Sequence, residues 1–248
     1  MDPHDNAPMP IDYFVWVIRN AERTLLVDTG FDHEEGRKRG RTIERLPREG
    51  LAMLGIDPAD IGNVIVSHLH YDHAGTFSDY PAARFHLQET EMAYATGACM
   101  CHEALRYPYT VDHICEMVRH VYSGRVRFAD GDAAIAPGVT AHLIGGHAKG
   151  IQAVRVETAN GPLVLASDCA HYYENFEKYR PFIITHDVEA TLRATTACAN
   201  SPAARPSASS PATTRWSCNA TPCQRSETRG HGGPAGLISC MTVGIGET

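Results

Sequence analysis

The chain has 248 residues, of which 43% are hydrophobic, which is enough for one domain with a sizeable core. A formal net charge of -7 argues against the clustered basic surface of a nucleic-acid-binding protein. No run of about eighteen apolar residues is present, and residues 1–5 lack the basic and apolar regions of a signal peptide. We therefore expect a cytoplasmic protein with reduced cysteines and with neither nucleic-acid nor membrane partners.

The first elements predicted along the chain are two strands and a helix. Residues 13–18 and 23–27 are β-branched or aromatic runs, and the short polar segment between them predicts a hairpin. Residues 42–54 carry apolar side chains at an imperfect helical spacing that Pro47 interrupts, and the pattern ends near Gly55. Further strands are predicted over residues 64–67, 83–87, 125–128, 139–144, 152–156 and 162–166, and a helical insert over residues 89–109. This alternation favours an α/β fold.

The most informative stretch is His-Leu-His-Tyr-Asp-His at residues 68–73, directly after an apolar run. Imidazole nitrogens together with a carboxylate oxygen suit Zn²⁺. On a strand end, His68 and His70 point to the same side, and a turn brings Asp72 and His73 back toward the same point. Burying these polar groups without a partner would cost several kcal/mol, which favours a metal site over an ordinary structural cluster.

The segment 68–73 resembles the metal signature of the metallo-β-lactamase superfamily. Three further motifs are similar to that family in the same order: the strand and Asp-Thr-Gly turn at 25–30, the second histidine motif at 145–150 and the bridging-aspartate motif at 166–169. The resemblance implies the α/β class with an αβ/βα four-layer sandwich and a two-metal site at one edge. Members usually begin with an earlier strand, so we expect a fold that is incomplete at both ends.

Within the superfamily, the chain most resembles the N-acyl homoserine lactonase group. The supporting stretches are residues 10–14, 28–32 and 174–176. The best-known lactonases carry a tyrosine three residues beyond the bridging aspartate, whereas this chain has His171 there, followed by Tyr172.

The resemblance implies two zinc ions and a small-molecule substrate. It assigns the first ion to His68, His70 and His147, the second to Asp72, His73 and a final histidine, and the bridging position to Asp168. Asp28 would orient a histidine ligand from behind rather than bind metal itself. His171 and Tyr172 would line the substrate cleft, or would pack as ordinary neighbours of the ligands.

The implied reaction is the opening of a lactone ring, which in this group means quorum quenching. A hydroxide between the two metals would attack the carbonyl, and Asp72 would protonate the leaving oxygen. One alternative is another hydrolase on the same scaffold, acting on a thioester, another lactone or a phosphoester. The other is an inactive product that keeps a single metal at His68, His70 and His147.

The last fifth of the chain departs from this pattern. Residues 194–248 show no sustained period, so we divide the chain into a hydrolase domain at 1–193 and an aberrant, poorly ordered tail at 194–248. With GC-rich codons chosen for residues 203–222, reading two bases later gives a string that contains Gly-His-Asp, the motif of the final ligand. We therefore hypothesise a frameshift. As written, the tail lacks this motif, and its one histidine, His231, is the alternative final ligand. Without a final ligand we expect the chain to hold one zinc ion rather than two.

Overall fold

The structure, a computed structural model, describes residues 11–159, 161–200 and 237–243. In this part of the chain a larger sheet has the strand order β10-β1-β2-β3-β4-β5 and a smaller one has the order β6-β7-β8-β9. Strands β2 to β5 pair in parallel, whereas β1 is antiparallel to both of its neighbours, as are all pairs in the second sheet. The strands are β1 (Tyr13–Arg19), β2 (Thr24–Val27), β3 (Asn63–Ile65), β4 (Arg84–Gln88), β5 (Val126–Ala129), β6 (Ala133–Ala136), β7 (Val139–Leu143), β8 (Gln152–Thr158), β9 (Gly161–Leu165) and β10 (Leu237–Val243).

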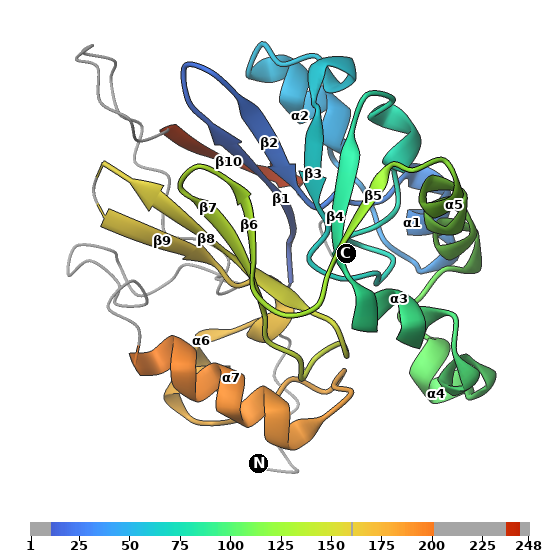
Figure 1. The fold of residues 1–248 in the computed structure, drawn as a ribbon. Coiled ribbons are helices and arrows are strands. Elements are labelled where there is room, and N and C mark those ends of the chain that lie inside the picture. The colour runs from blue at the N-terminus through green and yellow to red at the C-terminus, as the bar shows by residue number, and fades with distance from the viewer. Residues whose placement is uncertain (1–10, 160, 201–236, 244–248) are drawn as a thin grey trace.

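Helices flank both sheets. Figure 1 shows α1, α2 and α5 beside the larger sheet, and α6 and α7 beside the smaller one, with the two sheets between them. The helices are α1 (His33–Lys38), α2 (Pro47–Met53), α3 (Glu89–Ala95), α4 (Glu103–Arg106), α5 (Val111–Tyr122), α6 (Tyr173–Glu177) and α7 (Val188–Asn200). This arrangement confirms the predicted αβ/βα sandwich. No helix in the described ranges combines the length and the hydropathy needed to span a bilayer.

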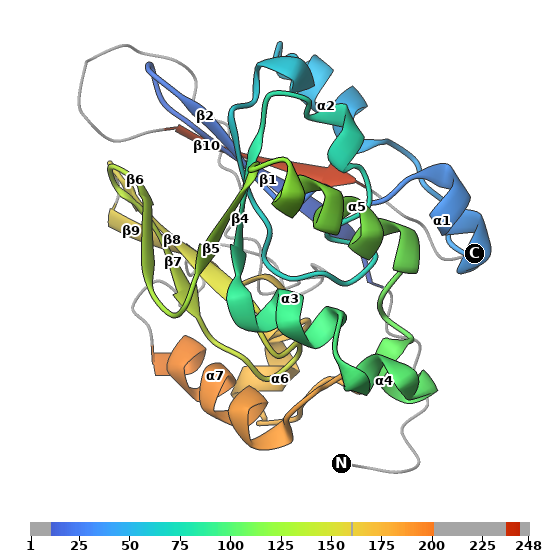
Figure 2. The same cartoon turned by 45° about the vertical axis from the view of Figure 1, so that its right-hand side comes forward.

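Alternate side chains of β1 contribute to two different layers of the core. Val15 and Val17 pack in the cluster that contains the helix residues Leu51 and Met117, whereas Trp16 lies in a second cluster with residues of β7, β8 and β9. Because successive side chains of a strand point to opposite faces, one strand serves both the helix layer and the sheet-to-sheet layer. The second core cluster therefore lies between the two sheets, whose relative arrangement is also seen in the turned view (Figure 2).

The predicted hairpin is confirmed by its turn. The Asn20 side chain accepts hydrogen bonds from the backbone N–H groups of Glu22 and Arg23, and β1 pairs with β2 on either side of it. The expected interruption at Pro47 is wrong, because α2 begins at this residue. Proline suits the first helical turn, where its missing N–H is not needed. Strand β6, made largely of alanine, was not predicted.

The metal-bearing strand is shorter than predicted. β3 ends at Ile65, so the histidines follow it in a loop and do not alternate along a strand. In the C-terminal region, α7 crosses the predicted boundary at residue 193, and β10 pairs with β1 along its whole length, although no strand was expected there. The segment 203–222 and His231 lie outside the described residues, so the frameshift and the division of the chain stay predictions.

Candidate metal centre

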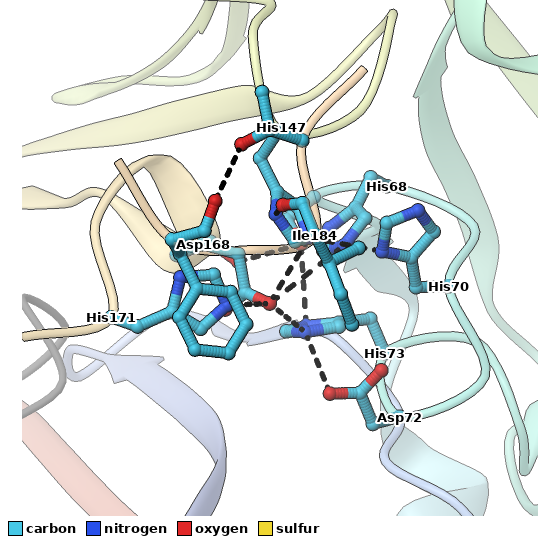
Figure 3. A network of polar contacts seen from close by, with 12 residues as sticks. His68, His70, Asp72, His73, His147, Asp168, His171 and Ile184 are labelled. Carbon is cyan, nitrogen blue, oxygen red and sulfur yellow. Dashed lines mark hydrogen bonds and ion pairs between the residues drawn. The ribbon is translucent and has the colours of Figure 1, made fainter. Parts of the chain in front are cut away.

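The site lies where three loops meet at one edge of the sandwich. His68, His70, Asp72 and His73 occupy the loop after β3, and His147 lies in the loop between β7 and β8. Asp168 belongs to the short 3₁₀ turn Ser167–Cys169 after β9, and His171 follows it. Figure 3 shows the imidazoles of His73, His147 and His171 turned toward the carboxylate of Asp168.

The Oδ2 atom of Asp168 is the common neighbour of the cluster. It lies 3.1 Å from Nε2 of His171, 3.2 Å from Nε2 of His73, 3.4 Å from Nε2 of His147 and 4.0 Å from Nε2 of His68. Nε2 of His147 is also 3.0 Å from Nδ1 of His70. Two donor atoms bound at about 2.1 Å to one tetrahedral zinc ion are about 3.4 Å apart. The side chains therefore have the spacing of ligands around a metal.

Within the part of the chain that the structure describes, three groups of potential ligands fall within coordination reach. In each group the ligand atoms lie within 4.8 Å of one another. The groups are His68, His70 and His147; His68, His73 and Asp168; and His147, Asp168 and His171. Because Asp168 and two of the histidines belong to more than one group, the arrangement has the shared-ligand character of a two-metal site.

An unsatisfied nitrogen supports this interpretation. His68 is fully buried, and its Nε2 atom has no hydrogen-bond partner among the described residues. Its Nδ1 lies 3.0 Å from the hydroxyl oxygen of Ser67. A buried polar atom without a partner is costly, so a nitrogen aimed into this cluster fits a metal ligand. The residues present thus fit a divalent metal of the zinc type.

Hydrogen bonds behind the site set the histidine tautomers. His147 Nδ1 donates to the carbonyl oxygen of Ile184 at 2.8 Å, because that oxygen can only accept. The Nε2 atom of a neutral His147 then carries the free lone pair toward the cluster. His73 Nδ1 faces Oδ2 of Asp28 at 2.8 Å, which directs its Nε2 toward Asp168. Such outer partners fix the orientation and raise the basicity of ligands.

Burial keeps three of the imidazoles neutral. It lowers the pKa of His68 and His70 well below the ordinary value, and that of His147 to about 4. Neutral imidazole is the form that binds metal. Burial also opposes the charge on His73, but the carboxylates of Asp72 and Asp168 raise its pKa well above the ordinary value.

Asp28 adopts a backbone conformation that is unusual for a residue with a side chain. Its φ of 62° lies in the left-handed region, as does the φ of 47° at Ser167. The Asp28 carboxylate accepts hydrogen bonds from the backbone N–H of Ser67 at 2.6 Å and from the Ser67 hydroxyl at 2.8 Å. The Ser67 hydroxyl in turn accepts from Ser167 at 2.9 Å. This chain of hydrogen bonds connects the loops that follow β2, β3 and β9, and it compensates for the strain.

Glu91 is a buried acid that the sequence did not single out. Its carboxylate accepts hydrogen bonds from the backbone N–H of Leu69 at 3.0 Å, from that of Gly150 at 2.8 Å and from the Tyr109 hydroxyl at 3.0 Å. Leu69 lies between two candidate ligands, and Gly150 closes the loop that carries His147. Glu91 therefore holds two ligand-bearing loops together. Nothing in the sequence marks it, since an acid in a helical segment normally faces solvent.

The remaining site residues predicted from the sequence divide into two kinds. Asp72 contacts Nε2 of His73 through its Oδ2 at 3.4 Å, so it belongs to the cluster. His171 also does, because it contacts Asp168 directly. Tyr172 lies farther out, with its ring centroid 6.1 Å from that of Phe182.

One known protein family matches most of this chain. The family model described as the metallo-beta-lactamase superfamily matches residues 10–206. The chain belongs to this superfamily. Its members with lactonase activity are metal-dependent hydrolases, and this chain is accordingly a metal-dependent hydrolase. The matched segment includes every residue of the cluster, which lies between positions 28 and 171.

Several superfamily members with a stated activity are similar to the chain. An N-acyl homoserine lactonase of Bacillus sp is 29% identical over 189 residues, covering 69% of this chain and 70% of that protein. A second one, from Agrobacterium fabrum, is 30% identical over 179 residues, covering 62% of each. Among solved structures, a quorum-quenching N-acyl homoserine lactone hydrolase superposes with a TM-score of 0.60 at 26% identity, covering 74% of this chain and 72% of that one.

Proposed function

We propose that this chain is a zinc-dependent lactonase that opens the ring of N-acyl homoserine lactones, a quorum-quenching activity. The observation that carries the proposal is the position of Asp168, whose Oδ2 lies within 3.4 Å of three imidazole nitrogens. The similar lactonases supply the substrate class.

We assign the metal ligands as the sequence predicted them. One ion is held by His68, His70 and His147, and the other by Asp72 and His73, with Asp168 shared between the two. The group His68, His70 and His147 supports the first set, and the group His68, His73 and Asp168 supports the place of His73 and Asp168, whereas Asp72 is assigned through its 3.4 Å contact with His73. When bound, the metals lower the pKa of a bound water to about 7 and polarise a carbonyl oxygen.

The protein residues perform the remaining tasks. Asp28 and Ile184 hold two ligand imidazoles in a single orientation, so little reorganisation accompanies the reaction. Asp72 is the acid that returns a proton to the ring oxygen as the lactone opens, and its side chain, 13% exposed, lies at the solvent side of His73. Tyr172 and the exposed edge of the cluster receive the substrate.

An assay against three substrate classes tests the proposal. The zinc-loaded protein is incubated with an N-acyl homoserine lactone, a glutathione thioester and a phosphodiester, and ring opening is followed by proton release. We expect turnover of the lactone above the other two, and its loss in Asp72→Asn. Preferential turnover of the thioester or the phosphodiester would identify a different hydrolase on the same scaffold.

An inactive protein with a single metal is the second candidate. It is favoured by one observation: among the described residues His73 is grouped only with His68 and Asp168, which the first ion also uses, and Asp72 belongs to none of the groups. Zinc content separates the two candidates. Two zinc ions per chain with lactone turnover support the lactonase, whereas one ion without hydrolysis supports the inactive form.

A further inference from the structure

We propose that His171 is itself a metal ligand, binding through Nε2 the ion that it shares with Asp168 and His147. The proposal rests on the metal centre of the proposed function and changes its ligand set. The resemblance to the lactonases does not supply this ligand, because the best-known members of that group carry a tyrosine at the corresponding position, where this chain has His171.

The distances around His171 are those of coordinating atoms. Its Nε2 is 3.1 Å from Asp168 Oδ2, the shortest of the four distances from that oxygen to a histidine nitrogen of the cluster. The potential ligand atoms of His147, Asp168 and His171 all lie within 4.8 Å of one another. Two ligands at about 2.1 Å from one ion are separated by no more than about 4.2 Å across it, so small side-chain movements bring all three into the first coordination sphere.

The surroundings of His171 hold its ring toward the cluster. The side chain is buried, and its ring stacks on Phe182 with centroids 3.8 Å apart and an interplanar angle of 18°. Its backbone N–H donates to the Asn175 side chain at 2.8 Å, which fixes the start of the turn. A substrate-binding side chain would need an exposed polar atom, but His171 is only 5% exposed. Because these contacts hold the ring in place before a metal binds, His171 is preorganised as a ligand.

This ligand adds a protein donor to the first ion. With His68, His70, His147 and Asp168 already near it, His171 raises the number of donors and strengthens the hold on that ion. None of the ligands proposed for this ion lies beyond position 171. A chain whose second ion lacks a final histidine can therefore still retain one ion firmly.

Metal binding by a substituted protein tests the assignment. Zinc and cobalt affinities of the full chain are measured by competition with a chromophoric chelator, and the bound metal is counted by atomic absorption. The variant His171→Phe keeps the stack on Phe182 but lacks a ligand nitrogen. The matched control His142→Phe makes the same change at a histidine on β7 that pairs with Asp132 instead.

We expect His171→Phe to weaken the tighter binding event at least about tenfold and to alter the visible spectrum of the bound cobalt, whereas His142→Phe leaves both unchanged. Equal affinity and an equal cobalt spectrum in the wild type and His171→Phe would overturn the assignment. If circular dichroism shows that His171→Phe is unfolded, ¹⁵N NMR of the zinc-loaded wild type decides, because the Nε2 shift of His171 either takes the metal-bound value or does not.

The outcomes also separate this inference from the proposed function. Weakened binding in His171→Phe, with no lactone turnover by the wild type, keeps the ligand and removes the lactonase. Lactone turnover with unchanged binding in His171→Phe keeps the lactonase and removes the ligand. A wild type that binds neither zinc nor cobalt removes both.

Discussion

Oδ2 of Asp28 lies 2.8 Å from Nδ1 of His73, although the two residues are 45 positions apart in the chain. The same carboxylate accepts the backbone N–H and the hydroxyl of Ser67. Burial raises the pKa of Asp28, and the contact with His73 opposes that rise. The carboxylate therefore orients His73 from behind while remaining outside the ligand set.

Replacing Asp28 by asparagine tests that role. In Asp28→Asn an NH₂ group replaces one of the carboxylate oxygens that accept hydrogen bonds from Ser67 and His73. The NH₂ group cannot accept these hydrogen bonds, so His73 loses its fixed orientation. We expect zinc affinity to fall about 10–100-fold, measured by chelator competition. Asp60→Asn, an exposed substitution, is the control. Equal affinities for zinc in Asp28→Asn and the control would contradict the role.

A second prediction concerns the bridge made by Glu91. In Glu91→Gln one side-chain atom becomes a donor opposite the N–H of Leu69 or Gly150, which leaves a buried donor unsatisfied. We expect the free energy of unfolding to fall by about 1–3 kcal/mol in urea titrations. Glu89→Gln, an exposed change on the same helix, should leave it within about 0.5 kcal/mol of the wild type. A loss as large in Glu89→Gln would show that the bridge is not the cause.

The close approach of Gly150 to Glu91 gives a third prediction. A Cβ added at Gly150 would lie 2.4 Å from the Cβ and the backbone nitrogen of Glu91, so backbone has to move. We expect Gly150→Ala to destabilise the protein by about 3 kcal/mol, measured by thermal unfolding. Gly62→Ala meets nothing within 4 Å and serves as the control. An unchanged melting temperature in Gly150→Ala would mean that the loop of Gly150 moves away from α3 at little cost.

The fourth prediction concerns the effect of zinc on stability. Neutral imidazoles packed around Asp168 bind zinc in the folded state only, so zinc stabilises that state by mass action. At about 100 times the dissociation constant the gain is about 2.7 kcal/mol, or about 5–10 °C in Tm. We expect EDTA to reverse this shift and Mg²⁺ not to reproduce it, since Mg²⁺ prefers oxygen ligands. Identical melting curves with and without zinc would argue against a metal centre.

The parts of the site that the sequence predicted are those with a local signal. The spacing within 68–73 and the glycine-rich motif around His147 are visible in the chain itself. The contacts that organise them are not, because they join distant residues. Ser67 and Ser167 are 100 positions apart, and Glu91 reaches Gly150 over 59. Such pairs are set by the packing of the two sheets.

The same distinction explains the errors in the fold. The hairpin at Asn20 was predicted because its turn residues act on their neighbours. β6 was missed because its alanines carry no alternation, and its place depends on pairing with β7. β10 was missed for a similar reason, since its position depends on β1, which lies more than 200 residues earlier in the chain.

That pairing has a consequence for synthesis on the ribosome. β1 emerges early, but the strand that covers its outer edge is encoded after every other element of the described structure. At about 5–20 residues per second, the edge stays open for about 10 to 40 s. An open edge that includes Val15 and Val17 is a template for pairing with other chains. Until its last strand arrives, the nascent protein therefore exposes an edge to which other chains can pair.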